Sequence, residues 1–543
     1  MGKEQNKYIQ YLGFGSFCVL IIWILYVVVP LFQDTFIPTH DGEYHIIRFA
    51  QFYESFMHGH SWFPRFAPDL NSGFGVPLFT FFYPLPNYLS LIFHGLGLSF
   101  VDSVKYISGL GYVVGVFFCF LWLRKIYSFI PSVLGTLAYA SVPYWFVDIF
   151  IRGSVGESLA MGCFTLLLYA IAGKKGVLIA ISSALLILSH NILAMLFIPV
   201  AFFYAYITSP LLMVYVFLGI GLTSWFWLPA LYERQFVLGL NSVDFRDHFL
   251  TLIQLLIPSW GTGFSGNGYV FNQMSFQIGI FSLFVIGWSF LVWIKNRVRE
   301  RIDLLFSVFG ILFVVSVFLM TEYSLVFWNY FPFLSNIQYP WRLLSFVPVI
   351  TGFCAAYILH TRKFHWFSML FFIVVPILLS YSYARPVQYE KREDSHYLTR
   401  KEFTDGTSSL GNSFSTRWLP WQSARVAQKI ESLSSETTIS GITLSPDRYT
   451  FTVNATKGDT IVVHISYYPG WSVYVDERRE EIDYSKGDIR FKVPAGIHTI
   501  VVKLTGTLDQ KIAYLISFFS LCVLALLIII RKRFEKSSKF ISP

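Results

Sequence analysis

The chain has 543 residues, of which 55% are hydrophobic and 13% are charged, whereas a soluble domain carries about 25% charged residues. Its net charge is +9, but the basic residues lie in short clusters between apolar runs. They therefore indicate membrane topology and not a surface that binds nucleic acid. Apolar runs long enough to cross a hydrocarbon layer of about 30 Å recur along the chain. The composition excludes an ordinary soluble protein and predicts one that crosses a membrane many times.

The apolar runs predict about twelve membrane spans. In chain order they cover residues 8–32, 104–123, 129–150, 155–173, 176–190, 192–208, 210–231, 277–295, 303–321, 342–360, 365–383 and 511–530. The first run is too long for a signal peptide and lacks the small-residue cleavage pattern, so we interpret it as the first span. Another apolar stretch, residues 84–98, opens with Pro84 and Pro86 and is interpreted as a re-entrant or interfacial segment.

The loops between these spans alternate in charge. Basic residues precede the first span, at Lys3 and Lys7, and then occur in nearly every second loop, as the positive-inside rule requires of cytoplasmic loops. They are Arg124, Lys125, Lys174, Lys175, Lys295, Arg297, Arg299, Arg301, Arg362, Lys363, Arg531, Lys532 and Arg533. The one predicted inner loop without charge lies near Ser209 and Pro210. Both termini are therefore predicted to be cytoplasmic. Four segments are predicted to lie on the outer side of the membrane, and they are residues 33–103, 232–276, 322–341 and 384–510.

The last outer segment, residues 384–510, differs from the rest in composition. From Thr438 onward β-branched and aromatic residues alternate with polar ones, and turn residues separate the runs, as at Pro469-Gly470. This pattern predicts a small antiparallel domain resembling a β-sandwich. The predicted fold is thus an all-α polytopic membrane domain over residues 1–383, an extracytoplasmic β domain over 384–510, and a final span with a basic cytoplasmic tail over 511–543.

Several kinds of site are not expected. The five cysteines, Cys18, Cys119, Cys163, Cys354 and Cys522, all fall in predicted spans, so we predict neither a disulfide nor a cysteine metal site. The chain has no Walker loop, no dinucleotide-binding glycine fingerprint, no zinc pattern and no nucleophile elbow. We therefore do not expect nucleotide-sugar chemistry on the cytoplasmic side.

A first candidate site follows the first span. Asp41, His45 and Arg48 share one face if this segment is a helix. The apolar residues between them, such as Ile46 and Phe49, predict a helix lying at the outer membrane surface. It would hold an acid, an imidazole and a guanidinium toward water or a cavity. The alternative is the solvated face of a loop helix.

Further candidates lie at the outer ends of other spans. Arg152 either pairs with Glu157 and pins a turn or faces a phosphate, which arginine binds well. Arg342 either snorkels at the mouth of a span or binds a lipid phosphate. The remaining candidates, each of which is either structural or part of a site, are His190, Glu233, Arg246, Asp247 and His248.

The shared position of these residues is informative. Side chains capable of catalysis gather at the outer ends of spans, and the inner loops carry almost only lysine and arginine. A cavity that opens outward at the membrane surface accounts for this distribution. A proton-driven transporter would hold acids in the middle of its spans, where this chain has almost none.

Several of these stretches resemble a known family. The run from His40 to Arg48, followed by Trp62–Arg65 and Gly73–Pro77, is similar to bacterial membrane proteins labelled 6-pyruvoyl-tetrahydropterin-synthase-related, although nothing in the chain suggests pterin chemistry. The tail around Tyr468–Asp476 and Val493–His498 resembles the β domain of the related YfhO-type proteins. Other matching stretches are Arg152–Glu157, His190-Asn191, Trp227–Leu231, Arg246–His248 and Pro340–Arg342.

Such proteins resemble the GT-C superfamily of glycosyltransferases, which implies a fold and an activity. GT-C enzymes have many spans and an acidic motif in the first outer loop, and they transfer a sugar from a polyprenyl-phosphate carrier outside the cytoplasm. Here Asp41-Gly42-Glu43 stands in the place of that motif. It is Asp-x-Glu and not Asp-x-Asp, which weakens the inference of a bound metal. A divalent cation, Mg²⁺ or Mn²⁺, is the one cofactor that the motif allows.

The resemblance also implies roles for the candidate residues. Asp41 is the expected base that takes the proton of the acceptor hydroxyl, with His45 assisting it and Glu43 as the second choice. Arg48, Arg152 and Arg342 are expected to stabilise the phosphate of the donor. A single displacement would invert the sugar carbon. Supporting roles fall to Glu157, His190, Glu233, Arg246, Asp247 and His248.

The expected setting is a bacterial plasma membrane. The partners would be the lipid bilayer, a polyprenyl-phosphate-sugar donor and an extracytoplasmic glycan or polymer acceptor, without nucleic acid. The β domain is expected to bind the acceptor or to cover the cavity, with Trp471 and Tyr474 either stacking on sugars or packing in the domain core. Two other functions remain open, a non-catalytic scaffold for envelope assembly and a transporter of lipid or polysaccharide.

Overall fold

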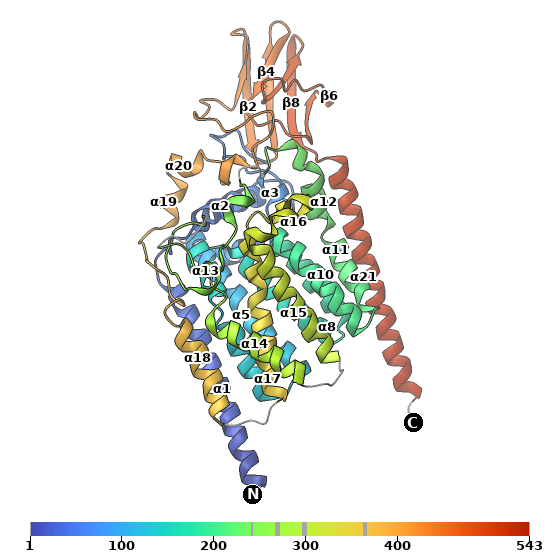
Figure 1. Cartoon of the computed structure of the whole chain (residues 1–543). Helices are drawn as coiled ribbons and strands as arrows, with labels where there is room; N and C mark the ends of the chain where they lie inside the picture. Colours follow the sequence, from blue (N-terminus) through green and yellow to red (C-terminus); the bar gives the residue numbers. More distant parts are fainter. Residues whose placement is uncertain (1, 240–242, 267–271, 296–300, 362–365, 542–543) are drawn as a thin grey trace.

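The computed structural model describes residues 2–239, 243–266, 272–295, 301–361 and 366–541. Within these residues, seven helices are long and apolar enough to cross a membrane, or up to nine if each of two bent helix pairs is one span. The chain is a multi-pass membrane protein, with a mostly helical bundle and a C-terminal β domain at one end of it (Figure 1). This confirms the predicted fold class. We call the end of the bundle nearest the strands the β-domain end.

The first half of the bundle contains the helices up to residue 232. They are α1 (Gly2–Val28), α2 (Gly42–Met57), α3 (Leu78–Phe81), α4 (Leu85–Gly95), α5 (Phe100–Ile126), α6 (Phe129–Ala140), α7 (Pro143–Val147), α8 (Val155–Ala172), α9 (Gly176–Ser189), α10 (Asn191–Thr208), α11 (Leu212–Leu222) and α12 (Ser224–Tyr232). Helix α5 packs against both α6 and α8, and nearly all apolar side chains of α6 and α8 are buried.

The second half completes the bundle. Its helices are α13 (Leu252–Leu256), α14 (Ile280–Lys295), α15 (Arg301–Met320), α16 (Leu325–Tyr330), α17 (Val347–Thr361), α18 (Trp366–Ser380), α19 (Asp394–Leu398), α20 (Lys401–Thr404) and α21 (Leu508–Ile541). Short 3-10 turns join several of them, over Val29–Phe32, Glu233–Phe236, Phe245–His248, Glu322–Ser324, Pro332–Ile337, Pro340–Phe346 and Leu410–Asn412. Helix α17 packs against α6 and α14, so residues from both halves share one apolar core.

Two predicted spans are bent and not straight. The run 129–150 divides into α6 and a second helical piece that ends at Arg152, with a bend of 44° between them. Pro143 begins the second piece, and a proline cannot donate the hydrogen bond that would continue α6. The run 210–231 divides into α11 and α12 with a bend of 65°. There the Thr223 hydroxyl donates to the carbonyl of Gly219 at 3.1 Å, a side-chain bond that bends helices.

Three other predicted spans form helices that are shorter than expected. Helices α9, α14 and α18 have 14, 16 and 15 residues. At 1.5 Å per residue they are about 21–24 Å long, less than the hydrocarbon layer of about 30 Å. The stretch 84–98 contains the 11-residue helix α4, which packs against α2 and α5. Its length fits the predicted re-entrant or interfacial segment better than a span.

The β domain consists of two antiparallel sheets that share one apolar core. One sheet has the order β1 (Ile430–Ser432), β4 (Asp459–Val463), β7 (Ile489–Val493), and the other has the order β2 (Thr437–Ser445), β3 (Arg448–Ala455), β8 (Gly496–Leu504), β5 (Trp471–Val475), β6 (Arg478–Glu480). Alternate residues of β3 face the core, as the sequence pattern predicts. Trp471 is 3% exposed and packs in this core against Tyr449, so it is not placed to stack on a sugar.

The segment between α18 and β1 has little regular structure and lies along the bundle. Its Asp394 carboxylate accepts hydrogen bonds from the main-chain N–H groups of Phe100 (2.8 Å) and Val101 (2.9 Å), at the start of α5. Acids stabilise this end of a helix. The main chains of Glu390 and Phe36 also pair. The strands therefore begin well after residue 384. Both chain ends lie at the end of the bundle away from the β domain (Figure 1).

Candidate functional site

A break in the helical backbone lies at the β-domain end of the bundle. After α7 the chain makes one π-helical turn, Asp148–Arg152, before Gly153 leads into α8. Single π turns inside helical segments are frequent at functional sites. Gly153 has a φ of +63°, and a Cβ atom there would lie 2.1 Å from Thr39 Oγ1. Only glycine fits both this conformation and this space.

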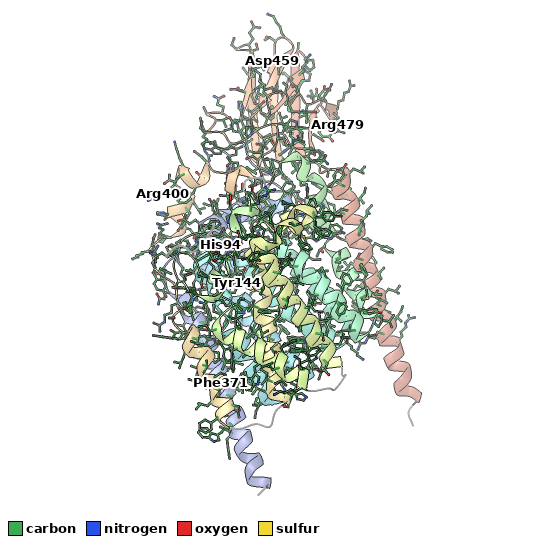
Figure 2. All side chains as sticks on the ribbon, viewed as in Figure 1. His94, Tyr144, Phe371, Arg400, Asp459 and Arg479 are labelled. Atoms are coloured by element: carbon green, nitrogen blue, oxygen red, sulfur yellow. The ribbon has the colours of Figure 1, made fainter. Side chains whose placement is uncertain are left out.

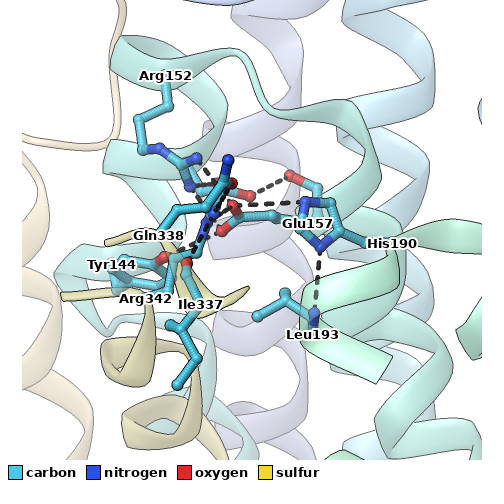
Figure 3. Close-up of polar contacts among 10 residues, drawn as sticks. Tyr144, Arg152, Glu157, His190, Leu193, Ile337, Gln338 and Arg342 are labelled. Carbon is cyan, nitrogen blue, oxygen red and sulfur yellow. Dashed lines mark hydrogen bonds and ion pairs between the residues drawn. The ribbon is translucent and has the colours of Figure 1, made fainter. Parts of the chain in front are cut away.

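The turn brings two carboxylates and two guanidinium groups together in the interior (Figure 3). Arg152 donates from Nη1 and Nη2 to the two carboxylate oxygens of Glu157, at 2.6 and 2.8 Å, and from Nη1 to Asp148 at 2.9 Å. Arg342, at the start of the span 340–361, donates from Nε to Glu157 at 2.9 Å. Asp148 and Glu157 are 0% exposed, and Arg152 and Arg342 are 4% and 7% exposed. Because all four groups are buried, their charges interact strongly, and they form one ion-pair cluster.

Neutral side chains complete the hydrogen bonding of the cluster. The Tyr144 hydroxyl donates to Glu157 at 3.1 Å, the Ser158 hydroxyl donates to Asp148 at 2.8 Å, and Arg342 donates to the side-chain oxygen of Gln338 at 2.6 Å. Figure 2 shows Tyr144 inside the bundle, below the β domain. With two positive and two negative groups, the cluster has no excess charge.

His190 joins this cluster as a neutral side chain. It lies between α9 and α10, where its Nδ1 accepts a hydrogen bond of 3.2 Å from the main-chain N–H of Leu193. Its proton is therefore on Nε2, which lies 3.7 Å from Glu157 Oε1 (Figure 3). His190 thus caps α10, as in the structural alternative for this residue, and also faces the cluster.

Asp41 lies beside the cluster and is held by its main chain. Its N–H donates to the carbonyl of Arg152 at 2.8 Å, and the N–H of His40 donates to Ile151 at 3.0 Å. Among the described residues, its carboxylate has no hydrogen-bond or ion-pair partner, and Asp41 is half-buried. Burial lowers the pKa of His40, and the charge of Asp41 opposes that shift. Asp41 is thus a carboxylate with free lone pairs at the edge of a neutralised cluster.

Helix α2 places His45 and Arg48 on one face, as its sequence predicts, but that face is covered. Arg48 donates from Nε to the Ser408 carbonyl at 3.1 Å, and its guanidinium lies 4.0 Å from the centre of the Phe82 ring. His45 is 1% exposed and packs against Phe82 and Tyr83. Burial, with the charge of Arg48, lowers the pKa of His45 well below 6.5. Neither side chain faces bulk water, because the segment around Ser408 lies over them.

Aromatic rings from other loops form a wall near Asp41. His248 packs against Tyr339 with ring centres 4.8 Å apart, and Phe264 lies 5.8 Å from Tyr339 and 5.3 Å from His40. His40 Nε2 is also 2.7 Å from the Thr262 carbonyl. Burial raises the pKa of Tyr339, and Asp41 contributes to this shift, so the two side chains lie in each other's field.

Other predicted site residues lie elsewhere. Glu233 is buried and ties the bundle to the β domain and α21, since it accepts hydrogen bonds from Tyr468, from Thr507 at 2.6 Å and from Gln510 at 2.8 Å. Arg246 and Asp247 are exposed. Arg246 pairs with Asp244 at 3.2 Å. The structure brings neither of these loop residues into the cluster.

A divalent cation does not fit this arrangement. Glu43 turns away from Asp41 and accepts a hydrogen bond of 2.5 Å from Arg392. In the part of the chain that the structure describes, no three His, Cys, Asp or Glu side chains come together in a way that could hold a metal ion. The acidic motif therefore supplies one carboxylate to the site and not two, and no chemical step is assigned to a metal.

Three residues of the cluster, Asp148, Tyr144 and Gln338, were not among the site residues predicted from the sequence. One signal was present for Asp148, which precedes Arg152 by four residues, the spacing of an ion pair on a helix. For Tyr144 and Gln338 no sequence signal was present. Each is one of many aromatic or polar residues near the end of a span, and its role follows from contacts made only in the folded bundle.

The chain has weak likenesses to solved membrane proteins. The mycobacterial arabinofuranosyltransferase AftD shares 14% identity over 70% of this chain and 27% of that protein, with a TM-score of 0.45. The apo oligosaccharyltransferase of Archaeoglobus fulgidus shares 14% identity over 74% of this chain and 57% of that protein, with a TM-score of 0.37. The chain thus spans about a quarter of AftD and just over half of the archaeal protein. No protein-family model and no curated protein matches the sequence. Function is therefore argued from the site.

Proposed function

We propose that this protein is a membrane glycosyltransferase of the GT-C kind, which moves a sugar from a polyprenyl-phosphate carrier to an acceptor hydroxyl on the outer side of a bacterial plasma membrane. The observation that carries the proposal is the carboxylate of Asp41, which has no partner in the described part of the chain and which the main chain holds beside a buried, neutralised cluster. The family resemblance of the segment around Asp41 supports the same reaction class.

Asp41 is the acid best suited to be the base. A general base needs free lone pairs within reach of the proton that it takes. Asp148 and Glu157 are buried and use their oxygens for Arg152, Arg342, Tyr144 and Ser158. Glu43, the second choice from the sequence, is paired with Arg392. Asp41 alone among these acids combines partial exposure with an unused carboxylate.

The reaction in this proposal is a single displacement. The acceptor oxygen attacks the anomeric carbon as its proton passes to Asp41. The bond between that carbon and the phosphate oxygen breaks, and the lipid phosphate leaves with the electron pair. Attack from the side opposite the leaving group inverts the sugar carbon. Charge develops on the phosphate, so a positioned cation would stabilise the transition state.

Arg48 and Arg342 are the cations that we assign to the phosphate. Arg48 has no carboxylate partner within ion-pair distance among the described residues and donates only to the Ser408 carbonyl. Arg342 has one nitrogen, Nη2, without a hydrogen bond in the same part of the chain. Arg152 is fully committed to Asp148 and Glu157, so the contacts favour its alternative role of pinning the turn.

The test is transfer by the full-length protein in proteoliposomes. A panel of radiolabelled polyprenyl-phosphate sugars is offered with glycan acceptors, and incorporation into the acceptor is measured beside empty liposomes. Transfer with inversion at the sugar carbon supports the proposal. If a folded protein transfers no sugar from any donor in the panel, the non-catalytic scaffold is favoured. In that case the buried ion-pair cluster would contribute only to stability.

A further inference from the structure

Another buried arginine, Arg65, differs from those of the cluster because it has no acidic partner among the described residues. Arg65 is 6% exposed. Its Nη2 donates to the Trp225 carbonyl at 2.6 Å and to the Tyr514 hydroxyl at 3.1 Å. Its Nε and Nη1 are buried and have no hydrogen-bond partner among the residues that the structure describes. Across the described residues, no carboxylate lies within ion-pair distance of Arg65. Burying a cation without a partner costs free energy. Such a group is expected to bind an ion or a water molecule.

Arg65 lines a cavity of about 160 Å³. Three parts of the chain form its walls. The segment after α2 contributes Ser61 and Phe63, the β domain contributes Asp447 and Thr505, and α21 contributes Tyr514. A water molecule occupies about 30 Å³, so the cavity has room for a group much larger than one water. None of these residues belongs to the site around Asp41.

The acid that lines the cavity is already paired. Asp447 accepts hydrogen bonds from the main-chain N–H of His60 at 3.1 and 3.0 Å, and His60 Nδ1 lies 2.9 Å from it. Arg65 therefore remains the uncompensated charge of the cavity. The Tyr514 hydroxyl accepts from Arg65, and its proton has no acceptor in the described part of the chain. Three guanidinium N–H bonds, one on Nε and two on Nη1, and one phenol O–H thus have no acceptor among the described residues and can donate to an anion.

The surroundings of the cavity indicate where such an anion would come from. Trp62 and Leu508, next in sequence to its wall segments, are each 74% exposed. Exposed tryptophan beside apolar residues at the end of a span is typical of the membrane interface. Arginine binds phosphate oxygens through paired N–H groups. A lipid headgroup and a free phosphate both offer this chemistry at the membrane surface.

We infer that the Arg65 cavity is a binding site for a phosphate group, formed jointly by the segment after α2, the β domain and α21. The site goes beyond the transfer reaction proposed above and does not depend on it. A bound phosphate pairs with the guanidinium and accepts from Tyr514, and this linkage holds the β domain against α21.

The test measures binding to the full-length protein, purified in the phosphate-free detergent dodecyl maltoside. Three probes are titrated: inorganic phosphate, dihexanoyl phosphatidylglycerol and dihexanoylglycerol, which lacks phosphate. We expect phosphatidylglycerol, inorganic phosphate or both to bind, and Arg65→Gln to weaken that binding at least tenfold. Arg448→Gln, which removes an exposed arginine next to Asp447, is the matched control and should leave the affinity within twofold.

The pattern of binding separates the sources. Binding of inorganic phosphate identifies a site that a free anion fills, and binding of phosphatidylglycerol alone identifies a lipid site. If Arg65→Gln does not fold, Tyr514→Phe is used as the test variant in its place. We expect Tyr514→Phe to weaken the binding of the phosphate probes three- to tenfold. The inference is overturned if neither phosphate probe binds, if dihexanoylglycerol binds as well as phosphatidylglycerol, or if the test variant binds like the wild type.

Discussion

The main-chain N–H of Asp41 donates a hydrogen bond of 2.8 Å to the carbonyl oxygen of Arg152. Together with the bond from His40 to Ile151, this joins the segment after α1 to the π turn before α8. The carboxylate of Asp41 is therefore placed by main-chain contacts, and within the described residues it makes no hydrogen bond or ion pair of its own.

Replacing Asp41 should separate activity from folding. We expect Asp41→Asn to lower the rate of sugar transfer by about 10²–10⁴, the usual contribution of a general base. The melting temperature should not change, because the carboxylate makes no hydrogen bond or ion pair among the described residues. Transfer is measured in proteoliposomes at equal protein content.

Asp34→Asn is the control for this change. Asp34 is exposed, lies in the same loop, and makes no side-chain hydrogen bond or ion pair in the described structure. It should transfer like the wild type. If Asp41→Asn also stays within a few-fold of the wild type, Asp41 is not the base.

Removing Glu157 should destabilise the bundle strongly. Glu157→Gln leaves Arg152 and Arg342 buried with one carboxylate, Asp148, between them. Breaking a buried ion pair in this way costs about 3–5 kcal/mol. The free energy of unfolding in detergent micelles is measured, with Glu54→Gln as the control. Glu54 pairs with His58 at the surface, where such a pair contributes about 0–1 kcal/mol. Equal losses for the two variants would show that the cluster is not a stabilising unit.

Gly153 should not accept a side chain. In Gly153→Ala the new Cβ would lie 2.1 Å from Thr39 Oγ1 and the backbone would keep a φ of +63°. Strain of this kind costs about 1–3 kcal/mol, and relief of the contact would displace the segment that carries Asp41. We expect both a lower melting temperature and slower transfer.

The matched control is Gly287→Ala in the middle of α14, where a Cβ meets nothing within 4 Å. Alanine stabilises a helix interior by about 1 kcal/mol relative to glycine. An unchanged Gly153→Ala variant would mean that the Thr39 contact does not fix the loop.

Stability should depend on pH through His45. Burial, with the charge of Arg48, lowers the pKa of His45 well below 6.5. Once pH falls below about 6.5, the unfolded state binds a proton that the folded state does not, so stability falls as pH decreases. The slope for one such group is at most about 1.4 kcal/mol per pH unit. Melting temperatures between pH 7.5 and 5 measure this loss.

Two variants test the assignment of that slope. His45→Phe should flatten it, and His58→Gln, at the exposed end of the same helix, should not. His464 acts in the opposite direction, because Asp488 and Glu431 raise its pKa. Its stabilisation is complete at low pH and is lost as pH rises through its folded-state pKa. His464→Gln should therefore remove the gain in stability that occurs as pH falls from the folded-state pKa of His464 to about 6.5, and leave the slope below about 6.5 unchanged. A slope that His45→Phe leaves unchanged would contradict the assignment.

The membrane segments were largely predictable from sequence, because the apolar run that spans a bilayer is a local feature. A helix covers each predicted run, but hydropathy did not show that Pro143 and Thr223 bend two of them. The alternation in β3 likewise predicted an inward and an outward face. The pairing of sheets around Trp471 was not visible, since it depends on contacts between strands distant in sequence.

The candidate site was predictable only in part. The sequence left two roles open for Arg152, which were to pair with Glu157 and pin a turn or to bind a phosphate. The contacts favour the turn. Local sequence gave no way to join Glu157 to Arg342, which is 185 residues away. Nor did it show that Glu43 faces Arg392 while its neighbour Asp41 remains unpaired.

The distance in sequence between Glu157 and Arg342 has a consequence for biosynthesis. Asp148, Arg152 and Glu157 are made within ten residues of one another, but the second guanidinium follows 185 residues after Glu157. At about 5–20 residues per second, it leaves the ribosome about 10–40 s later. Until then two carboxylates face one cation at the end of a span, where unpaired charge is costly. A chain truncated before Arg342 would retain that imbalance, because the second cation of the cluster would never be made.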